Sequence, residues 1–183
     1  MKKIAFALAA VATMLSTSAM AQAYMSGGLG VSHVNVDCSG APTCDTNDTA
    51  VKLTGGYSFG NGFAAELGYI NFGTAKMADS TASLNIKPEA FTIGGAYRAA
   101  INKDWAISAR LGVASVKAKL SATLGSLSGS DTETHTQAYF GLNTDYAINK
   151  NVKAEIGADF TRAEFSGEKA SVRALTVGLR YDF

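Results

Sequence analysis

The fold is decided by the last nine residues of the chain, Leu175-Thr176-Val177-Gly178-Leu179-Arg180-Tyr181-Asp182-Phe183. Large apolar side chains occupy every second position of this stretch, and Thr, Gly, Arg and Asp stand between them. A period of two residues predicts a β-strand with two unlike faces, because successive side chains of a strand point to opposite sides. One face of this strand is bulky and apolar, and the other is small or charged.

The same alternation recurs in seven other stretches of the chain. The eight predicted strands cover residues 25–36, 51–59, 63–69, 91–98, 105–113, 138–146, 152–160 and 175–183. The first of these is the weakest, since it rests mainly on Leu29 and Val31. In every other stretch the bulky side chains share one face, so the pattern predicts an all-β protein.

The connections between the predicted strands are of two kinds. Three are tight turns rich in Asn and Gly, at residues 60–62, 102–104 and 149–151. The other four are polar and mostly longer, and we expect loops at residues 37–49, 74–88, 121–133 and 166–169. Short turns that alternate with longer loops, on an even number of strands, are typical of outer-membrane barrels. Both chain ends then lie on the short-turn, periplasmic side.

The chemistry of the two faces separates a membrane barrel from a soluble β-sandwich or a lipocalin-like barrel. An eight-stranded barrel has an interior just wide enough for side chains, which suits the small and charged set. The bulky set then faces lipid, and ring closure pairs the backbone groups that hydrocarbon cannot hydrogen-bond. We therefore predict that residues 24–183 form an eight-stranded antiparallel up-and-down transmembrane β-barrel.

The positions of the aromatic residues agree with a membrane interface. Eight of them lie near the tight turns or the C-terminus, namely Tyr57, Phe59, Phe63, Tyr97, Trp105, Tyr146, Tyr181 and Phe183. We expect these to form an aromatic girdle at one rim, with Phe72, Phe160 and Phe165 toward the opposite ends of their strands.

The first 23 residues have the layout of a secretory signal peptide. Lys2 and Lys3 precede a short apolar core at residues 4–15, and Ala21-Gln22-Ala23 forms a small-x-small cleavage pattern. The apolar core is shorter than the roughly 20 residues that a membrane-spanning helix needs. We expect cleavage after Ala23.

Seven charged residues fall on the predicted inner face, five at similar depth from the short-turn rim and two, Arg110 and Asp159, a little further in. They are Glu66, Arg98, Arg110, Asp145, Glu155, Asp159 and Arg180. This lumen charge network has two interpretations, an ion path or gate and a set of salt bridges that fills the interior. The second is favoured, because eight strands leave little room for water and unpaired buried charges cost several kcal/mol. The expected conductance is low and poorly selective.

Cysteine and histidine offer few other candidate sites. Cys38 and Cys44 lie in the first predicted loop and are expected to form a disulfide, since the chain is exported. A metal site would need nearby histidines, and none accompanies the two thiols. His33 and His135 stand in ordinary polar strand surroundings, so no catalytic, metal or cofactor site is expected.

The leader, the eight strands and the closing segment together resemble small outer-membrane barrels of the OmpA/OmpX type and the opacity-protein-like barrels. The ending Leu179, Tyr181, Phe183 resembles the C-terminal signal that the outer-membrane assembly machinery reads. The resemblance implies a location in the bacterial outer membrane and says little about activity.

Three functions remain open at this point. The net charge of +1 lacks the strongly basic balance of a nucleic-acid binder, so no nucleic-acid partner is expected. The first hypothesis is a non-enzymatic monomer that serves envelope structure or contacts lipopolysaccharide, a host ligand or another surface through its extracellular loops. The second is a narrow porin-like channel for small solutes. The third is a lipid-modifying barrel enzyme.

Overall fold

The computed structural model describes residues 22–35, 43–78, 82–124, 127–165 and 167–183. Ten strands lie in these ranges: β1 (Gln22–Val34), β2 (Thr43–Asp45), β3 (Asn47–Ser58), β4 (Phe63–Asn71), β5 (Ala75–Ala78), β6 (Ala82–Ala100), β7 (Trp105–Leu124), β8 (Leu127–Ala147), β9 (Val152–Phe165) and β10 (Glu168–Asp182). Across these described residues, no helix is long and apolar enough to pass through a membrane.

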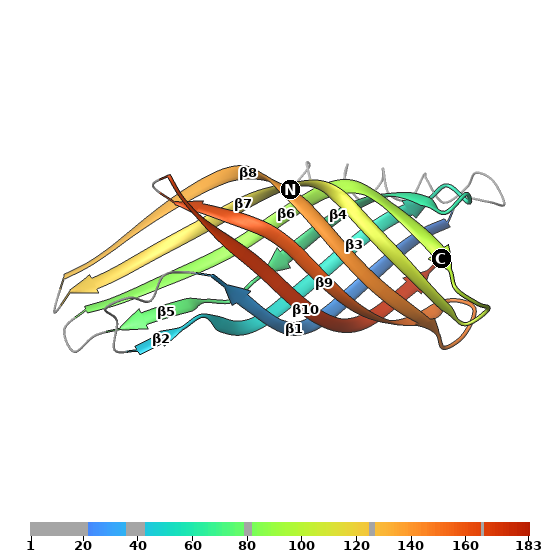
Figure 1. Ribbon diagram of the computed structural model, residues 1–183, viewed down its shortest axis with the longest axis horizontal. Helices are drawn as coiled ribbons and strands as arrows, with labels where there is room; N and C mark the ends of the chain where they lie inside the picture. Colours follow the sequence, from blue (N-terminus) through green and yellow to red (C-terminus); the bar gives the residue numbers. More distant parts are fainter. Residues whose placement is uncertain (1–21, 36–42, 79–81, 125–126, 166) are drawn as a thin grey trace, which may run out of the picture.

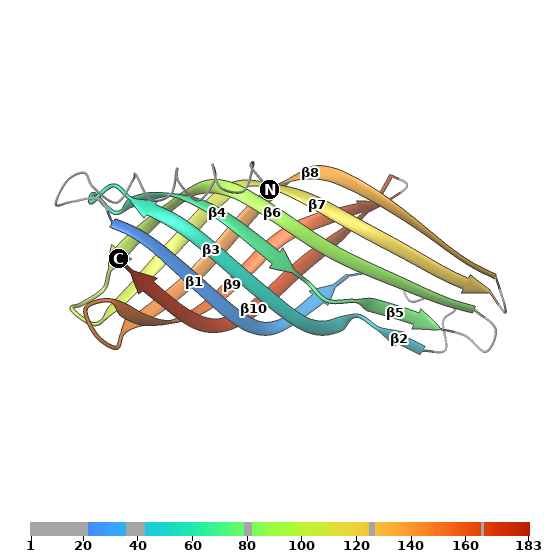
Figure 2. The same cartoon turned by 180° about the vertical axis from the view of Figure 1, so that it is seen from behind.

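Eight of the strands close into one antiparallel barrel, as predicted. Around the wall, β4, β3, β1, β10, β9, β8 and β7 follow one another, and β6 pairs with both β4 and β7 to complete the ring. The short strands β2 and β5 continue β3 and β4 beyond the barrel and pair with each other. Figures 1 and 2 show the tilted strands of the front and back walls.

The two faces of each strand are sorted as the alternation predicts. On β4, Leu67 is 62% exposed on the outer surface, whereas its neighbour Glu66 is 9% exposed and points into the lumen. The same holds for the other outward apolar residues, which include Leu29, Leu53, Ile93, Ile107, Leu142, Ile156, Val177 and Leu179. Large apolar side chains therefore cover the outside, whereas the interior is lined by small and polar residues together with a group of buried apolar ones.

Aromatic side chains mark both edges of this apolar band. Near the tight turns, ring pairs form across neighbouring strands, as for Phe63 with Tyr97 at 4.8 Å and Trp105 with Tyr146 at 5.0 Å between centroids. At the other edge, Phe140 stacks on Phe160 at 6.1 Å. Phe72 directly follows the same end of β4, as predicted, but its side chain is 1% exposed and lies inside the barrel. The side chain of Phe165 lies outside the described residues.

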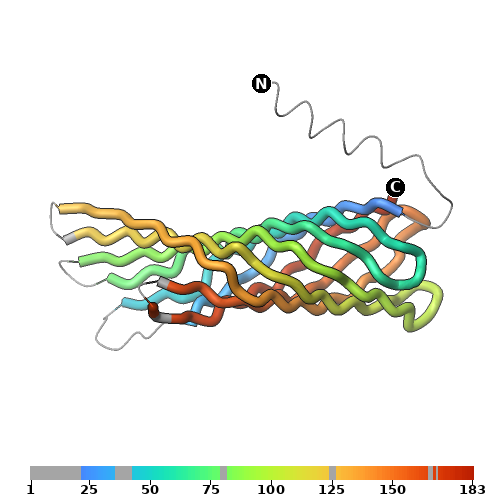
Figure 3. The backbone as a smooth tube through the Cα atoms, turned by 90° about the horizontal axis from the view of Figure 1, so that it is seen from above, coloured from blue at the N-terminus to red at the C-terminus, as the bar shows by residue number. Residues whose placement is uncertain are grey.

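Two of the predicted long loops consist mostly of strands in the described residues. Residues 74–88 contain β5 and the first part of β6, and residues 121–133 contain the end of β7 and the start of β8. β7 has 20 residues and β8 has 21, about twice the 9–11 that cross a membrane. Ser and Thr alternate with other residues here and suit a strand whose backbone is paired, with no need for an apolar face. Figure 3 shows these strands projecting well past the barrel.

The first and last strands close the ring at their tight-turn ends. The backbone N–H of Phe183 donates to the carbonyl oxygen of Ala23 at 3.0 Å, and Tyr24 pairs with Asp182. Residues 1–21 lie outside the described residues, so the signal peptide and its cleavage after Ala23 stay predictions.

Two glycine pairs bring the backbones of adjacent strands together on opposite sides of the barrel. Gly28 pairs with Gly178 between β1 and β10, and Gly94 pairs with Gly112 between β6 and β7, four strands away around the wall. A Cβ added to any of the four would stand 2.9 Å or less from a backbone oxygen of the partner strand. Only glycine allows this approach at the two seams.

We expect Gly178→Ala to destabilise the barrel by about 1–3 kcal/mol, because its new methyl group would stand 2.1 Å from the carbonyl oxygen of Gly27. Gly55→Ala is the matched control, since a Cβ there meets nothing within 4 Å. Urea unfolding in lipid vesicles measures both. Equal stability of the two variants would contradict the close-approach argument.

Candidate functional site

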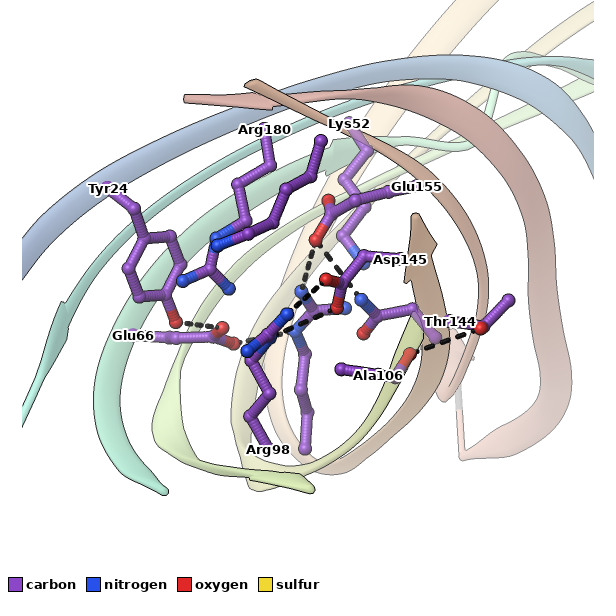
Figure 4. A network of polar contacts seen from close by, with 12 residues as sticks. Tyr24, Lys52, Glu66, Arg98, Ala106, Thr144, Asp145, Glu155 and Arg180 are labelled. Atoms are coloured by element: carbon purple, nitrogen blue, oxygen red, sulfur yellow. Dashed lines mark hydrogen bonds and ion pairs between the residues drawn. The ribbon is translucent and has the colours of Figure 1, made fainter. Parts of the chain in front are cut away.

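The lumen contains the largest gathering of buried charge among the described residues, and Figure 4 shows part of it from close by, including Glu66, Arg98 and Asp145. Each charge occupies an inward position of a strand whose outward neighbours face lipid. The alternation that makes the wall amphipathic therefore also directs these side chains toward one another across the barrel.

Arg110 holds the centre of this network and is 2% exposed. Its Nε donates to Glu66 Oε2 at 2.7 Å, and its Nη2 lies 3.8 Å from Glu155 Oε1. The Tyr24 hydroxyl donates to Glu66 Oε1 at 2.5 Å, and Asn143 Nδ2 donates to Glu155 Oε1 at 3.1 Å. Both carboxylates are thus satisfied by groups from several different strands.

A second cluster lies around Asp159, which is fully buried. Lys52 Nζ reaches both of its carboxylate oxygens at 2.6 Å, and the Tyr139 hydroxyl donates to Oδ1 at 2.5 Å. Lys52 is missing from the predicted network, although the alternation in residues 51–59 already places it on the inner face. Its partner is on β9, and a sequence does not show which strands face each other across the lumen.

The remaining predicted charges pair nearer the tight turns. Arg98 forms two bonds with Asp145, with Nη2 2.5 Å from Oδ2 and Nε 3.2 Å from Oδ1. Arg180 Nε donates to Asp182 Oδ1 at 2.8 Å, and its guanidinium lies 3.6 Å above the ring centroid of Tyr24. Lys153 also binds Asp182. All seven residues of the predicted network take part in ion pairs, and Tyr24, Lys52, Tyr139, Lys153 and Asp182 are additions to it.

Apolar side chains fill the part of the lumen that lies between the charges and the projecting strands. This apolar cluster consists of Val34, Ala50, Ile70, Phe72, Ala75, Ala90, Ala114, Val116, Tyr139, Ala163, Val172 and Ala174. Among the charges, the space lined by Lys52, Arg110 and Glu155 measures about 10 Å³. That is room for about one water molecule. The described interior is therefore a packed core in two layers, one of ion pairs and one of apolar side chains.

The other predicted sites fall at the ends of the strands. Cys44 lies in β2, and Cys38 lies outside the described residues, so their disulfide stays a prediction. Leu179, Tyr181 and Phe183 face outward, and the last two rings touch at 5.0 Å. Their role as an assembly signal also stays a prediction. No group of three potential metal ligands occurs among the described residues.

We expect Lys52→Met to destabilise the barrel by about 3–5 kcal/mol, because it leaves the buried carboxylate of Asp159 without its cation. Lys87→Met is the same substitution at an exposed pair with Glu89, where the N–O distance is 3.4 Å, and it should change stability by less than about 1 kcal/mol. Free energies of unfolding in lipid vesicles test the difference. A small effect at both lysines would show that the buried pair contributes nothing.

Comparison with known proteins agrees with this architecture. The family model described as an outer membrane protein β-barrel domain matches residues 6–183. No curated protein matches the sequence.

Solved structures show the same fold at low identity. Ail, the attachment invasion locus protein of Yersinia pestis, is 21% identical with a TM-score of 0.59, covering 88% of this chain and 98% of Ail. Neisserial surface protein A is 17% identical with a TM-score of 0.60, over 88% of this chain and 97% of its own. A major outer membrane protein from Thermus thermophilus is 12% identical with a TM-score of 0.61, over 89% and 99%. With nearly its whole length matched by the family model, the chain belongs to the family of outer membrane protein β-barrel domains.

Proposed function

We propose that the chain is a non-enzymatic outer-membrane protein that contacts a partner surface through the strands that project into the extracellular space. The observation that carries this proposal is the continuation of β6, β7 and β8 past the lipid-facing band. A membrane anchor needs no such extension, and binding residues are commonly placed on segments held away from a rigid scaffold.

The packed lumen supports a role outside solute transport. An aqueous path along the axis would have to cross the layer of ion pairs and then the apolar cluster. Removing water from the charges without their partners is costly, and the side chains of the apolar cluster, apart from the Tyr139 hydroxyl that is bonded to Asp159, offer no hydrogen bond to an ion. The surface of the protein is therefore the better candidate for function than its interior.

The outer face of the extension has a chemistry of its own. Lys87 and Lys119 stand directly opposite each other on β6 and β7, and Lys117 lies two residues from Lys119. Like charges in such a cross-strand pair repel, and a bound anion relieves the repulsion. On β6, Glu89 pairs with Lys87 and stands directly opposite Lys117, so it partly offsets the three charges. This lysine face favours a polyanionic partner.

A protein of similar fold suggests which polyanion can be used to test this proposal. Ail of Yersinia pestis has been solved in complex with sucrose octasulfate, an analogue of heparin. At 19% identity the likeness concerns the fold, and for this chain a sulfated polyanion is a proposal that rests on the lysine face.

The histidines give little support to an enzymatic role. His33 Nδ1 lies 3.0 Å from Asn47 Oδ1 and 3.2 Å from Thr46 Oγ1. His135 Nε2 lies 3.2 Å from Glu133 Oε2. Among the described residues, neither imidazole bonds a serine or cysteine side chain that a general base would activate.

We expect the pure protein to give only low, poorly selective currents in planar bilayers, because both lumen layers are packed. Trimming the apolar cluster alone, with Ile70→Ala and Phe72→Ala, should not raise the current, since the ion-pair layer still closes the path. Large and stable single-channel currents from the unchanged protein would support the channel function instead.

The polyanion proposal is tested by retention of the folded protein on immobilised heparin. We expect Lys117→Gln with Lys119→Gln to weaken binding by about fivefold or more, with a reduced dependence on salt. A variant in which a two-residue turn replaces residues 120–131 should lose part of the extension and keep the barrel. The matched control, Lys103→Gln with Lys150→Gln, removes the same charge from the periplasmic turns and should bind as before. Equal retention of all four proteins would contradict the proposal.

A further inference from the structure

Two hollows lie next to each other on the lipid-facing wall, the first on β6 to β10 and the second on β7 to β10. The first, of about 560 Å³, is lined on its outer surface by Ile107, Ala109, Leu142, Ile156, Ala158 and Leu175. The second, of about 530 Å³, is lined by Leu111, Phe140, Phe160, Arg162, Ser171 and Arg173. On each of β7 to β10, outward residues of the second hollow follow those of the first toward the extracellular side, so the two hollows adjoin along the wall, and together they make up the groove.

The first hollow, which is nearer the tight turns and is called the lower hollow, is apolar and lies beside the hydrocarbon. Ala109, Leu142, Ala158 and Leu175 are successive partners across the four strands. The two alanines leave a depression between the leucines, and no polar side chain projects into it from this row. A depression of this kind in a membrane wall accepts a hydrocarbon chain, which fills it with close contacts.

The second hollow, called the upper hollow, combines aromatic rings with two cations. Arg173 is the cross-strand partner of Phe160, and Arg162 is the next outward residue on β9, so the arginines are diagonal neighbours. Both side chains are exposed. Neither guanidinium forms an ion pair with any described residue. The nearby Glu164 is engaged by Gln137 at 2.8 Å and Lys169 at 3.7 Å.

On the extracellular side of the two arginines, β8 and β9 are no longer paired with each other. The backbone ladder between β8 and β9 ends at Phe140 and Phe160, although both strands continue. The arginines therefore stand at the border of an uncovered edge, immediately outside the aromatic residues that mark the membrane interface. This is the depth at which the outer leaflet carries its phosphate groups.

We propose that this groove binds one molecule of a phosphorylated, multiply acylated glycolipid of the outer leaflet, of the lipid A type. One acyl chain fills the lower hollow, and a phosphate group lies between Arg162 and Arg173. Arginine suits this role, because its planar donors bind two phosphate oxygens at once. The site is separate from the lysine face of the extension, and it does not depend on what that face binds.

The test is native mass spectrometry of the detergent-solubilised full barrel titrated with bisphosphorylated hexa-acyl lipid A. We expect one molecule to bind the wild type, and Arg162→Gln with Arg173→Gln to lower its affinity about tenfold or more. Ala158→Leu, which fills the lower hollow, should also lower the affinity. The heat-dependent shift in electrophoretic mobility verifies that each variant is folded.

Matched controls separate this groove from general lipid contact. Lys103→Gln with Lys150→Gln removes two charges at the opposite rim, and Ala65→Leu adds the same bulk on the outer face of β4. Both should bind lipid A like the wild type. Undiminished binding by the arginine variant, or an equal loss in the controls, would overturn the proposal. Equal affinity for dephosphorylated lipid A would overturn the phosphate contact, and equal affinity for phosphatidylglycerol would overturn the assignment to a glycolipid.

Discussion

Hydrocarbon offers no hydrogen bond to a peptide group, and the rest of this structure depends on that constraint. A strand that crosses the bilayer must find a partner on both sides, so the sheet has to close on itself. Closure at eight strands leaves an interior only as wide as its side chains. Most bulky apolar residues, such as Leu67, then face the outside, and Glu66 and its partners have no place except the inside.

The sequence predicts the wall of the barrel better than its edges. Alternation assigns Leu67 and Glu66 to opposite faces, because a strand has no other way to direct them. It also carries enough information to place the side chain of Phe72 inside the barrel, because Phe72 has the same parity as Glu66 and Ile70. The ends of the strands were missed because pairing above the membrane does not require an apolar face. The strands of residues 74–88 and 121–133 therefore look like polar loops in the sequence.

The partners within the lumen were beyond the reach of the sequence for a different reason. Ion pairs such as Lys52 with Asp159 join residues 107 positions apart, and which strands face each other depends on the tilt of the whole ring. Depth along the strand can be counted from the turns, and that count placed five of the charges at one level, with Arg110 and Asp159 further in. Counting residues does not show which side chains face each other across the lumen. The ion pairs and the hydrogen bonds of Tyr24 and Tyr139 therefore appear only in the three-dimensional structure.

The buried carboxylates also determine how the barrel comes apart. Glu66 on β4 is held from β1 by Tyr24 and from β7 by Arg110, while Asp159 on β9 is held from β3 by Lys52 and from β8 by Tyr139. Detaching any one hairpin strips a charge of its counterpart while that charge still lies in a region of low dielectric constant. A partly opened barrel is consequently a state of high free energy, and we expect the barrel to unfold in a single cooperative step.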